Sequence, residues 1–196
     1  MGRKQSWDNA WDVGAMSNYN TITSLAESPV EEGLIYAGTD DGFIQVSENG
    51  GDSWRKIPVT NLGLAPRSFV NDIKADLFDV NTVYVALDNH KEGDYNPYLF
   101  KTSDYGKNWE SVLDGKNIRG YSLSFIQDPI EKKLLFLGTE NGLWISIDEG
   151  NNWVQFKNGF PSVSTMDLVI QENESALVIG TFGRAIWVLD LSLIHI

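Results

Sequence analysis

The sequence lacks cysteine altogether and contains only two histidines, His90 and His195, among its 196 residues. Without cysteine there is no disulfide framework and no thiolate metal site. Two histidines also exclude a multi-histidine zinc centre, so the sequence predicts neither a metal nor a cofactor. A Ser-His-Asp triad would have to use His90, because His195 lies in a terminal segment that is set aside below.

Basic residues are scarce as well, with 15 Lys and Arg against 27 Asp and Glu and a net charge of -12. No Lys/Arg cluster is present to neutralise a phosphate backbone, so nucleic acid is not an expected partner. The acidity is typical of a solvated surface, and a cationic ligand is the alternative. No apolar run approaches the roughly 18 residues of a membrane span, and polar residues follow Met1 to Lys4. We therefore predict no membrane insertion and no export signal within this segment.

What is present is an internal repeat. Three octets fit the pattern Ser/Thr, any, Asp/Asn, any, Gly, any, any, Trp, and they begin at Ser47, Thr102 and Ser146, 55 and 44 positions apart. Each follows two apolar, β-rich runs separated by a glycine-bearing turn. Four short strands repeated about every 45 residues are typical of a propeller blade. The predicted fold class is all-β, a β-propeller with four-stranded antiparallel blades.

The repeat divides the chain into three complete blades and one partial blade, at 19–59, 68–113, 120–157 and 163–190. Residues 1–190 are therefore expected to form an incomplete ring of about four blades, with the missing blades elsewhere in a parent chain and the first twenty residues in a preceding blade or connector. Asp41-Gly42 and Asn141-Gly142 predict two-residue hairpin turns with positive φ at both central residues. Residues 191–196 resemble a translated sequencing adapter and are set aside.

The octets are predicted to be structural turns between third and fourth strands. Their hydroxyl and carboxylate or amide side chains would bond turn amides, their glycines would adopt conformations that a Cβ penalises, and their tryptophans would be buried between strands. The residues assigned this role are Ser47, Asn49, Gly51 and Trp54; Thr102, Asp104, Gly106 and Trp109; and Ser146, Asp148, Gly150 and Trp153.

The second blade is irregular, because the segment 88–98 replaces a compact turn between its second and third strands. This segment would emerge on the face opposite the octets, together with the equivalent turn of the fourth blade. Its tyrosines and polar residues are typical of a recognition surface, and a merely tolerated loop is the alternative. Asp88, His90 and Asp94 would otherwise make a weak cation site. The predicted ligand-binding residues are Asp88, His90, Asp94, Tyr95, Tyr98, Phe182 and Arg184.

The octets resemble the Asp box, or bacterial neuraminidase repeat, with Asn49 in place of Asp in the first copy. Across residues 6–190 the chain resembles large bacterial sortilin-like repeat proteins, on the segments 7–14, 36–42, 86–91 and 180–184. Such proteins are often labelled glycosyl hydrolases because of the repeat. The resemblance implies an exported protein, secreted, periplasmic or on the cell surface, whose propeller binds peptide or glycan.

The sequence supports a catalytic function less well than a binding function. Sialidase-type chemistry would need three arginines around a carboxylate, and the few arginines present do not supply them. A xyloglucanase-type hydrolase needs only two carboxylates. Aligning the first strands makes Ser24, Asp72, Ser124 and Asp167 equivalent, so Asp72 and Asp167 would face the channel two blades apart. We thus expect a non-catalytic recognition module that binds protein, peptide or glycan, with a glycoside hydrolase as the alternative and an assembly-factor scaffold third.

Overall fold

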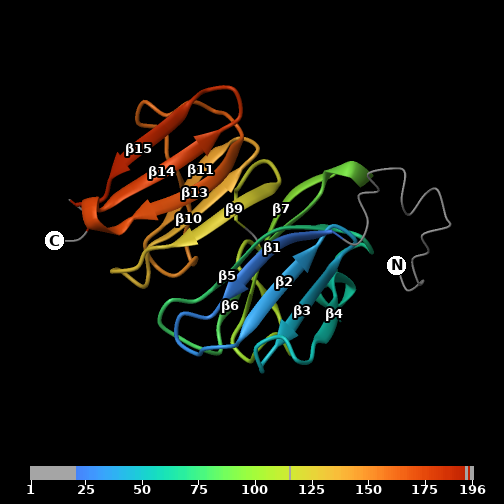
Figure 1. Ribbon diagram of the computed structural model, residues 1–196. Helices are drawn as coiled ribbons and strands as arrows, with labels where there is room; N and C mark the ends of the chain where they lie inside the picture. The colour runs from blue at the N-terminus through green and yellow to red at the C-terminus, as the bar shows by residue number, and fades with distance from the viewer. Residues whose placement is uncertain (1–20, 115, 193, 195–196) are drawn as a thin grey trace.

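The computed structural model describes residues 21–114, 116–192 and 194, and in this part the strands form four consecutive antiparallel sheets (Figure 1). The expected preceding blade or connector, residues 1–20, lies outside the described residues, as does His195. The first sheet contains β1 (Ile22–Glu27), β2 (Ile35–Thr39), β3 (Phe43–Ser47) and β4 (Arg55–Pro58), and the short 3-10 helix η1 (Val59–Leu62) follows it.

The other three sheets repeat this order. The second contains β5 (Phe69–Ala75), β6 (Val83–Asn89), β7 (Asp94–Thr102) and β8 (Glu110–Ser111), with the 3-10 helix η2 (His90–Glu92) between β6 and β7. The third contains β9 (Ser122–Gln127), β10 (Leu135–Thr139), β11 (Gly142–Ser146) and β12 (Val154–Gln155). The last contains β13 (Thr165–Gln171), β14 (Ala176–Thr181) and β15 (Ile186–Asp190), with the 3-10 helix η3 (Glu172–Glu174) between β13 and β14.

The first strands of neighbouring sheets lie side by side, β1 with β5, β5 with β9 and β9 with β13. Each sheet then runs outward in chain order, so every sheet is one blade. Figure 1 shows these blades following one another around the molecule. The predicted fold, an all-β propeller with four-stranded antiparallel blades in an incomplete ring, is confirmed.

The core lies between the blades, because both faces of each inner sheet are apolar. One cluster joins the third and fourth blades and includes Phe136, Leu143, Leu177 and Ile179, all essentially buried. Complete burial of such a side chain stabilises the fold by about 1.5–3 kcal/mol. Leu191, which the sequence analysis set aside with the terminal segment, belongs to this cluster, and its backbone N–H donates to Ser175 O at 2.7 Å. The structured chain therefore extends at least to this residue.

A glycine in the second strand allows neighbouring blades to approach closely. A Cβ on Gly38 would lie 2.3 Å from Val70 Cγ1 of the next blade, and one on Gly138 would lie 2.7 Å from the Thr165 carbonyl oxygen of the next blade. Both distances are below 3.0 Å, which is too short for a Cβ atom and a heavy atom to which it is not bonded. The Gly-Thr pair that recurs in the sequence is thus explained by the packing between blades.

Two local expectations need correction. Asp41 and Asn141 do not adopt positive φ, and the glycine after each does, with φ of 83° at Gly42 and 132° at Gly142. In the third blade Thr139 pairs with Gly142, so the turn residues are Glu140 and Asn141. From the sequence, the fourth strands of the second and third blades are expected at 109–113 and 153–157, but β8 and β12 have two residues each.

The two end blades expose apolar positions that are buried elsewhere. Ile186 occupies the position of Ile44, Leu99 and Leu143 in the strand register; it is 70% exposed, whereas the other three are fully buried. These three side chains pack between their own blade and the next one, and the described residues supply no further blade beside Ile186. In an incomplete ring the end blade has no neighbour on one side, so Ile186 is exposed there.

Candidate functional site

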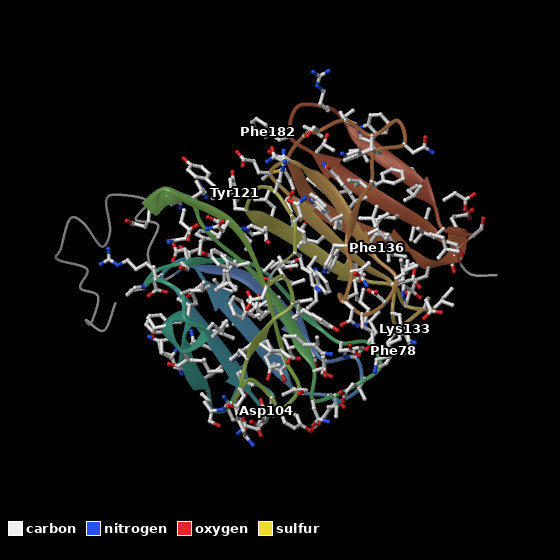
Figure 2. All side chains as sticks on the ribbon, turned by 180° about the vertical axis from the view of Figure 1, so that it is seen from behind. Phe78, Asp104, Tyr121, Lys133, Phe136 and Phe182 are labelled. Atoms are coloured by element: carbon white, nitrogen blue, oxygen red, sulfur yellow. The ribbon has the colours of Figure 1, made fainter. Side chains whose placement is uncertain are left out.

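The propeller has two distinct faces. On one face, which we call the octet face, the octets contact the turns between first and second strands, as in the 2.9 Å bond from Gly50 N to Gly33 O. On the other, the loop face, the turns between second and third strands meet the connections between blades, as in the 3.1 Å bond from Ser164 Oγ to Glu140 O. Figure 2 shows Asp104 on the lower side of the molecule and Tyr121 and Phe182 on the upper side.

The three octets share one hydrogen-bond pattern. The hydroxyl oxygen of the first residue accepts the backbone N–H of the glycine four positions later, at 2.8 Å for Ser47, 2.9 Å for Thr102 and 2.8 Å for Ser146. The same hydroxyl donates to the acidic or amide side chain two positions later, which is Asn49, Asp104 or Asp148. The glycines that donate these N–H groups, Gly51, Gly106 and Gly150, have φ of 96°, 78° and 87°.

The carboxylates of the second and third octets are held by amides. Asp104 Oδ1 accepts the backbone N–H groups of Lys107 and Asn108, and the Asn108 side chain donates to Oδ2. The bonds from Asn108 lower the pKa of Asp104 to about 2. Asn152 lowers the pKa of Asp148 in the same way. In the first octet the Asn49 side-chain oxygen accepts the Ser53 N–H at 2.9 Å without a charge.

The octet tryptophans depend on the preceding blade. Trp109 packs against the core cluster of the first blade, and Trp153 packs against the cluster that includes second-blade residues. Trp54, expected to be buried between strands, is 43% exposed. That expectation is wrong for this copy because no preceding blade lies beside it among the described residues. Its Nε1 donates to Gly51 O at 3.0 Å, as Trp109 Nε1 does to Gly106 O at 3.2 Å.

Ser24, Asp72, Ser124 and Asp167 occupy equivalent positions, as the sequence alignment predicted. Each pairs with its second strand beside a register irregularity, opposite Gly38, Ala86, Gly138 and Gly180. The first two side chains join neighbouring blades: Ser24 Oγ accepts the N–H of Ile73 at 2.8 Å, and Asp72 Oδ2 accepts the N–H of Phe125 at 2.9 Å.

Asp72 and Asp167 differ in environment. Burial raises the pKa of Asp72, although Lys74, 3.3 Å away, and the Phe125 amide both oppose this effect. Asp167 is exposed and accepts its neighbour's amide, Leu168 N, at 2.9 Å. Asp72 therefore already serves as a link between blades, and no bond joins the two carboxylates within the described part of the chain.

The segment 88–98 is a hairpin extension rather than a loop. Strand β7 begins at Asp94, Asn89 pairs with Asp94, and Leu87 pairs with Tyr98 across a bulge, with η2 at the tip. The sequence expectation of a loop is corrected in this respect, because β6 and β7 both extend into the insertion, although their pairing is irregular there. A paired backbone presents its side chains at defined positions on the loop face.

A buried carboxylate anchors this hairpin. Asp88 is 2% exposed, and its Oδ1 accepts the backbone N–H of His90 at 3.2 Å and lies 2.5 Å from His90 Nδ1. Its Oδ2 accepts from Asn71 Nδ2 at 2.6 Å, and the same amide nitrogen donates to Ser122 O of the third blade at 2.6 Å. Asp88 thus joins His90 of the hairpin to Asn71 of the inner strand.

The anchored histidine forms part of an aromatic cluster. The His90 ring stacks on Tyr121 of the third blade, with centroids 4.6 Å apart and an interplanar angle of 19°. Tyr95 is 58% exposed and also lies near Tyr121, with the two ring centroids 6.4 Å apart. The sequence analysis missed Tyr121. Its position, directly before the inner strand of the blade that follows the irregular hairpin, was the available signal.

Asp94 and Tyr98 bond to each other within the hairpin. Tyr98 Oη donates to Asp94 Oδ2 at 2.6 Å. Burial alone would raise the pKa of Asp94, but the bonds from Tyr98 and Asn96 lower it. Burial and the same bond raise the pKa of Tyr98. In the part of the chain that the structure describes, no group of three or more His, Cys, Asp or Glu residues is arranged to hold a metal ion, so Asp88, His90 and Asp94 do not form the alternative cation site.

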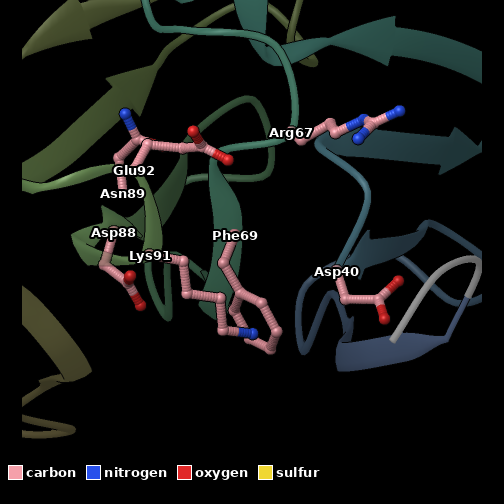
Figure 3. A pocket seen from close by; sticks show the side chains of 7 residues that line it. All are labelled: Asp40, Arg67, Phe69, Asp88, Asn89, Lys91 and Glu92. Atoms are coloured by element: carbon pink, nitrogen blue, oxygen red, sulfur yellow. The ribbon is translucent and has the colours of Figure 1, made fainter. Parts of the chain in front are cut away.

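A small pocket opens on the other side of the hairpin, between the first and second blades. Its volume is about 110 Å3. Figure 3 shows Lys91 extended along Phe69, whose ring centroid is 4.8 Å from Lys91 Nζ. The pocket is lined by residues of both charges, Asp40, Arg67, Phe69, Asp88, Asn89, Lys91 and Glu92.

Phe182 and Arg184 belong to a different part of the loop face, the β14–β15 turn of the fourth blade. Phe182 is 74% exposed, and the Arg184 carbonyl accepts from Trp187 Nε1 at 2.9 Å. The remaining predicted residues Asp88, His90, Asp94, Tyr95 and Tyr98 all lie on the second-blade hairpin. The seven residues thus come from two turns of the loop face, in the second and fourth blades.

Structural comparison places the chain among β-propellers. The GH74 xyloglucanase from Xanthomonas campestris aligns with a TM-score of 0.70 at 17% identity, over 90% of this chain and 30% of the enzyme. YCF48 bound to D1 peptide aligns with a TM-score of 0.57 at 13% identity, over 88% of this chain and 56% of YCF48. At these identities the likeness shows the fold alone. No family model matches the sequence.

Sequence similarity then points to a particular kind of propeller protein. The chain is 25% identical over 105 residues to "Vacuolar protein sorting/targeting protein 10" of Pyrenophora teres f. teres, which covers 48% of this chain and 7% of the relative. The protein of the same name in Neosartorya fischeri is 30% identical over 120 residues, which covers 59% of this chain and 8% of that relative. The chain thus spans less than a tenth of these relatives. The similarity supports a sortilin-like propeller, while the bacterial origin stays a prediction.

Among the described residues, no helix has the length and apolar character needed to cross a membrane.

Proposed function

We propose that the chain is part of a non-catalytic recognition propeller, acting outside the cytoplasm, that binds a protein or peptide through its loop face. The observation that carries this proposal is the aromatic cluster of His90, Tyr95 and Tyr121, which two blades build together. The buried Asp88 and Asn71 hold the cluster in place before any ligand arrives. A preorganised aromatic surface loses little entropy on binding, which favours recognition.

The comparisons favour a peptide or protein over a glycan. The relatives with sequence similarity are named as sorting and targeting proteins, and one propeller with a similar fold is bound to a peptide. The relatives are named for vacuolar sorting and targeting, which supports the proposed location outside the cytoplasm, at the cell surface, in the periplasm or in secreted form. A glycan ligand remains the second choice, because tyrosine rings also stack on sugars.

The test is a screen followed by substitution. A random peptide library and a glycan array would be screened against the chain, and the selected ligands would be measured against Tyr95→Ala and Tyr121→Ala. We expect selected peptides to lose at least about tenfold in affinity, or about 1.4 kcal/mol. The control is Ile147→Ala, an exposed apolar residue on the octet face. A protein partner whose binding ignores both tyrosines would instead indicate the assembly-factor scaffold.

A glycoside hydrolase is the second candidate function, favoured by the raised pKa of Asp72, since a general acid needs such a shift. Xyloglucan and sialoside hydrolysis would be assayed with Asp72→Asn, Asp167→Asn and the octet-face control Asp52→Asn. Because Asp72 also links two blades, the folded fraction of each variant would be measured by circular dichroism. Hydrolysis that disappears in a folded Asp72 or Asp167 variant, but not in the control, would refute the non-catalytic proposal.

A further inference from the structure

A second pocket on the loop face lies at the outer side of the third blade and has a volume of about 570 Å3. Its walls come from the connection before β9, the β10–β11 turn, the residues around β12, and the connection to the fourth blade. The lining residues are Arg119, Asn141, Gln155, Phe156, Lys157, Phe160, Pro161 and Ser162.

The walls are held by bonds among the lining residues themselves. Gln155 Nε2 and Ser162 Oγ both donate to the Asn141 carbonyl oxygen, at 2.9 and 3.0 Å. Phe160 is almost fully buried and packs edge-on against Trp187, with centroids 5.5 Å apart. The lining is thus mainly polar, with Phe156 and Phe160 as its aromatic part, and ligand sites combine placed polar groups with apolar contact area.

The charge of this pocket opposes that of the chain. Arg119 and Lys157 line it and no carboxylate does, although the chain carries a net charge of -12. Within residues 21–114, 116–192 and 194, neither cation has a carboxylate at ion-pair distance. Two cations without local partners create a positive potential that attracts an anion, and a guanidinium binds a carboxylate through two parallel bonds.

The pocket and the aromatic cluster share one connection between blades. Arg119 precedes Tyr121 by two residues, and Gly120 between them has φ of 78°. One short connection therefore contributes a cation to the pocket and an aromatic ring to the cluster. A peptide lying over Tyr121 has this cation within one or two residues of its path.

We propose that this pocket is an anion subsite that takes a carboxylate joined to an apolar group. The carboxylate would bind Arg119 and Lys157, and the apolar group would lie on Phe156 and Phe160. The inference rests on the proposed function in assigning the ligand to a peptide. Two sources share this chemistry: the last residue of a peptide chain, and an Asp or Glu side chain beside an apolar residue.

The experiment is an NMR titration of the 15N-labelled chain with three small probes: N-acetyl-phenylalanine, N-acetyl-phenylalaninamide, and N-acetyl-aspartyl-phenylalaninamide. We expect saturable shifts at the Gln155 side-chain amide and the Phe160 backbone amide, with millimolar affinity for a carboxylate probe and binding about tenfold weaker for the neutral amide. Preference for the first probe identifies a chain terminus, and preference for the third identifies an acidic side chain. Either preference supports the subsite.

Variants isolate the two cations. Arg119→Gln and Lys157→Gln should each lower the affinity for the preferred carboxylate probe at least about fivefold. Lys107→Gln, which removes a cation from the octet face, should leave this affinity unchanged. Equal affinity for the carboxylate and the neutral amide, or no saturable shift, would overturn the inference. If that occurs while Tyr121→Ala still abolishes binding of a selected peptide, the proposed function stands and only the subsite fails.

Discussion

The octet face and the loop face are built on the same sheets, yet they differ in how closely the blades repeat one another. On the octet face three copies have the same hydroxyl-to-glycine bond within 0.1 Å, from 2.8 to 2.9 Å. On the loop face the second blade carries a hairpin extension and the third a two-residue turn. The regular face stabilises the blades, and the irregular face distinguishes this propeller from others with the same fold.

The largest expected effect comes from glycines with a left-handed backbone on the two faces. A Cβ on Gly150 would lie 2.4 Å from Val112 Cγ1 of the preceding blade, whereas one on Gly93, at the tip of the hairpin, would contact nothing within 4 Å. Gly150→Ala should therefore lower the free energy of unfolding by about 2–5 kcal/mol, and Gly93→Ala by about 1–2 kcal/mol. Urea denaturation measures both, and equal losses would show that packing between blades does not distinguish the faces.

A smaller difference is expected for serine hydroxyls. Ser146, almost fully buried, accepts the Gly150 N–H, so Ser146→Ala leaves a buried amide without its acceptor. We expect a loss of about 1–3 kcal/mol in the free energy of unfolding. Ser162→Ala on the loop face should change it by less than about 0.5 kcal/mol, because Ser162 is exposed. A larger cost for Ser162 than for Ser146 would reverse the assignment of the scaffold to the octet face.

The smallest expected effect is a pH dependence that separates the octets from one another. The pKa of Asp104 in the folded chain, about 2, lies below its ordinary value of 3.8, and the pKa of Asp148 is also lowered. Their stabilising contribution is thus complete above pH 3.8 and is lost as the pH falls through the folded pKa. Hydrogen exchange would follow the amides of Asn108, Asn152 and Ser53.

After correction for the intrinsic pH dependence of exchange, the Asn108 and Asn152 amides should lose protection between about pH 4 and pH 2. The Ser53 amide should not, because its acceptor Asn49 does not titrate in this range. An equal loss of protection at all three amides would mean that protonation of Asp104 and Asp148 is not what destabilises their turns.

The sequence predicted the fold well because the blade repeat is local. The octet spacing located the blades, and aligning the inner strands placed Asp72 and Asp167 in equivalent positions that the register bears out. Exposure was predicted less well. Trp54 has the same local sequence pattern as Trp109, but the described residues place no blade before it, and no pattern within an octet reports on that neighbour.

The candidate site was predicted only in part, because it joins segments that are distant in sequence. The hairpin residues His90 and Tyr95 stood out as an irregularity, but their partner Tyr121 follows about 30 residues later, directly before an ordinary inner strand. The pocket around Arg119 and Lys157 draws on four separate segments, each unremarkable by itself. The overall composition did not indicate this pocket either, because a net excess of acidic residues says nothing about where the few basic residues lie in the fold.

The dependence of each octet tryptophan on the blade before it means that the repeat in the sequence is not the unit of cooperativity. Trp109 and Trp153 are completed by residues of another blade, and every core cluster lies across a boundary between blades. The unit that packs as one is thus the joint formed by the facing sides of two adjacent blades. Stability in such an array grows with the number of joints, so removing one terminal blade removes one joint and leaves the others to fold.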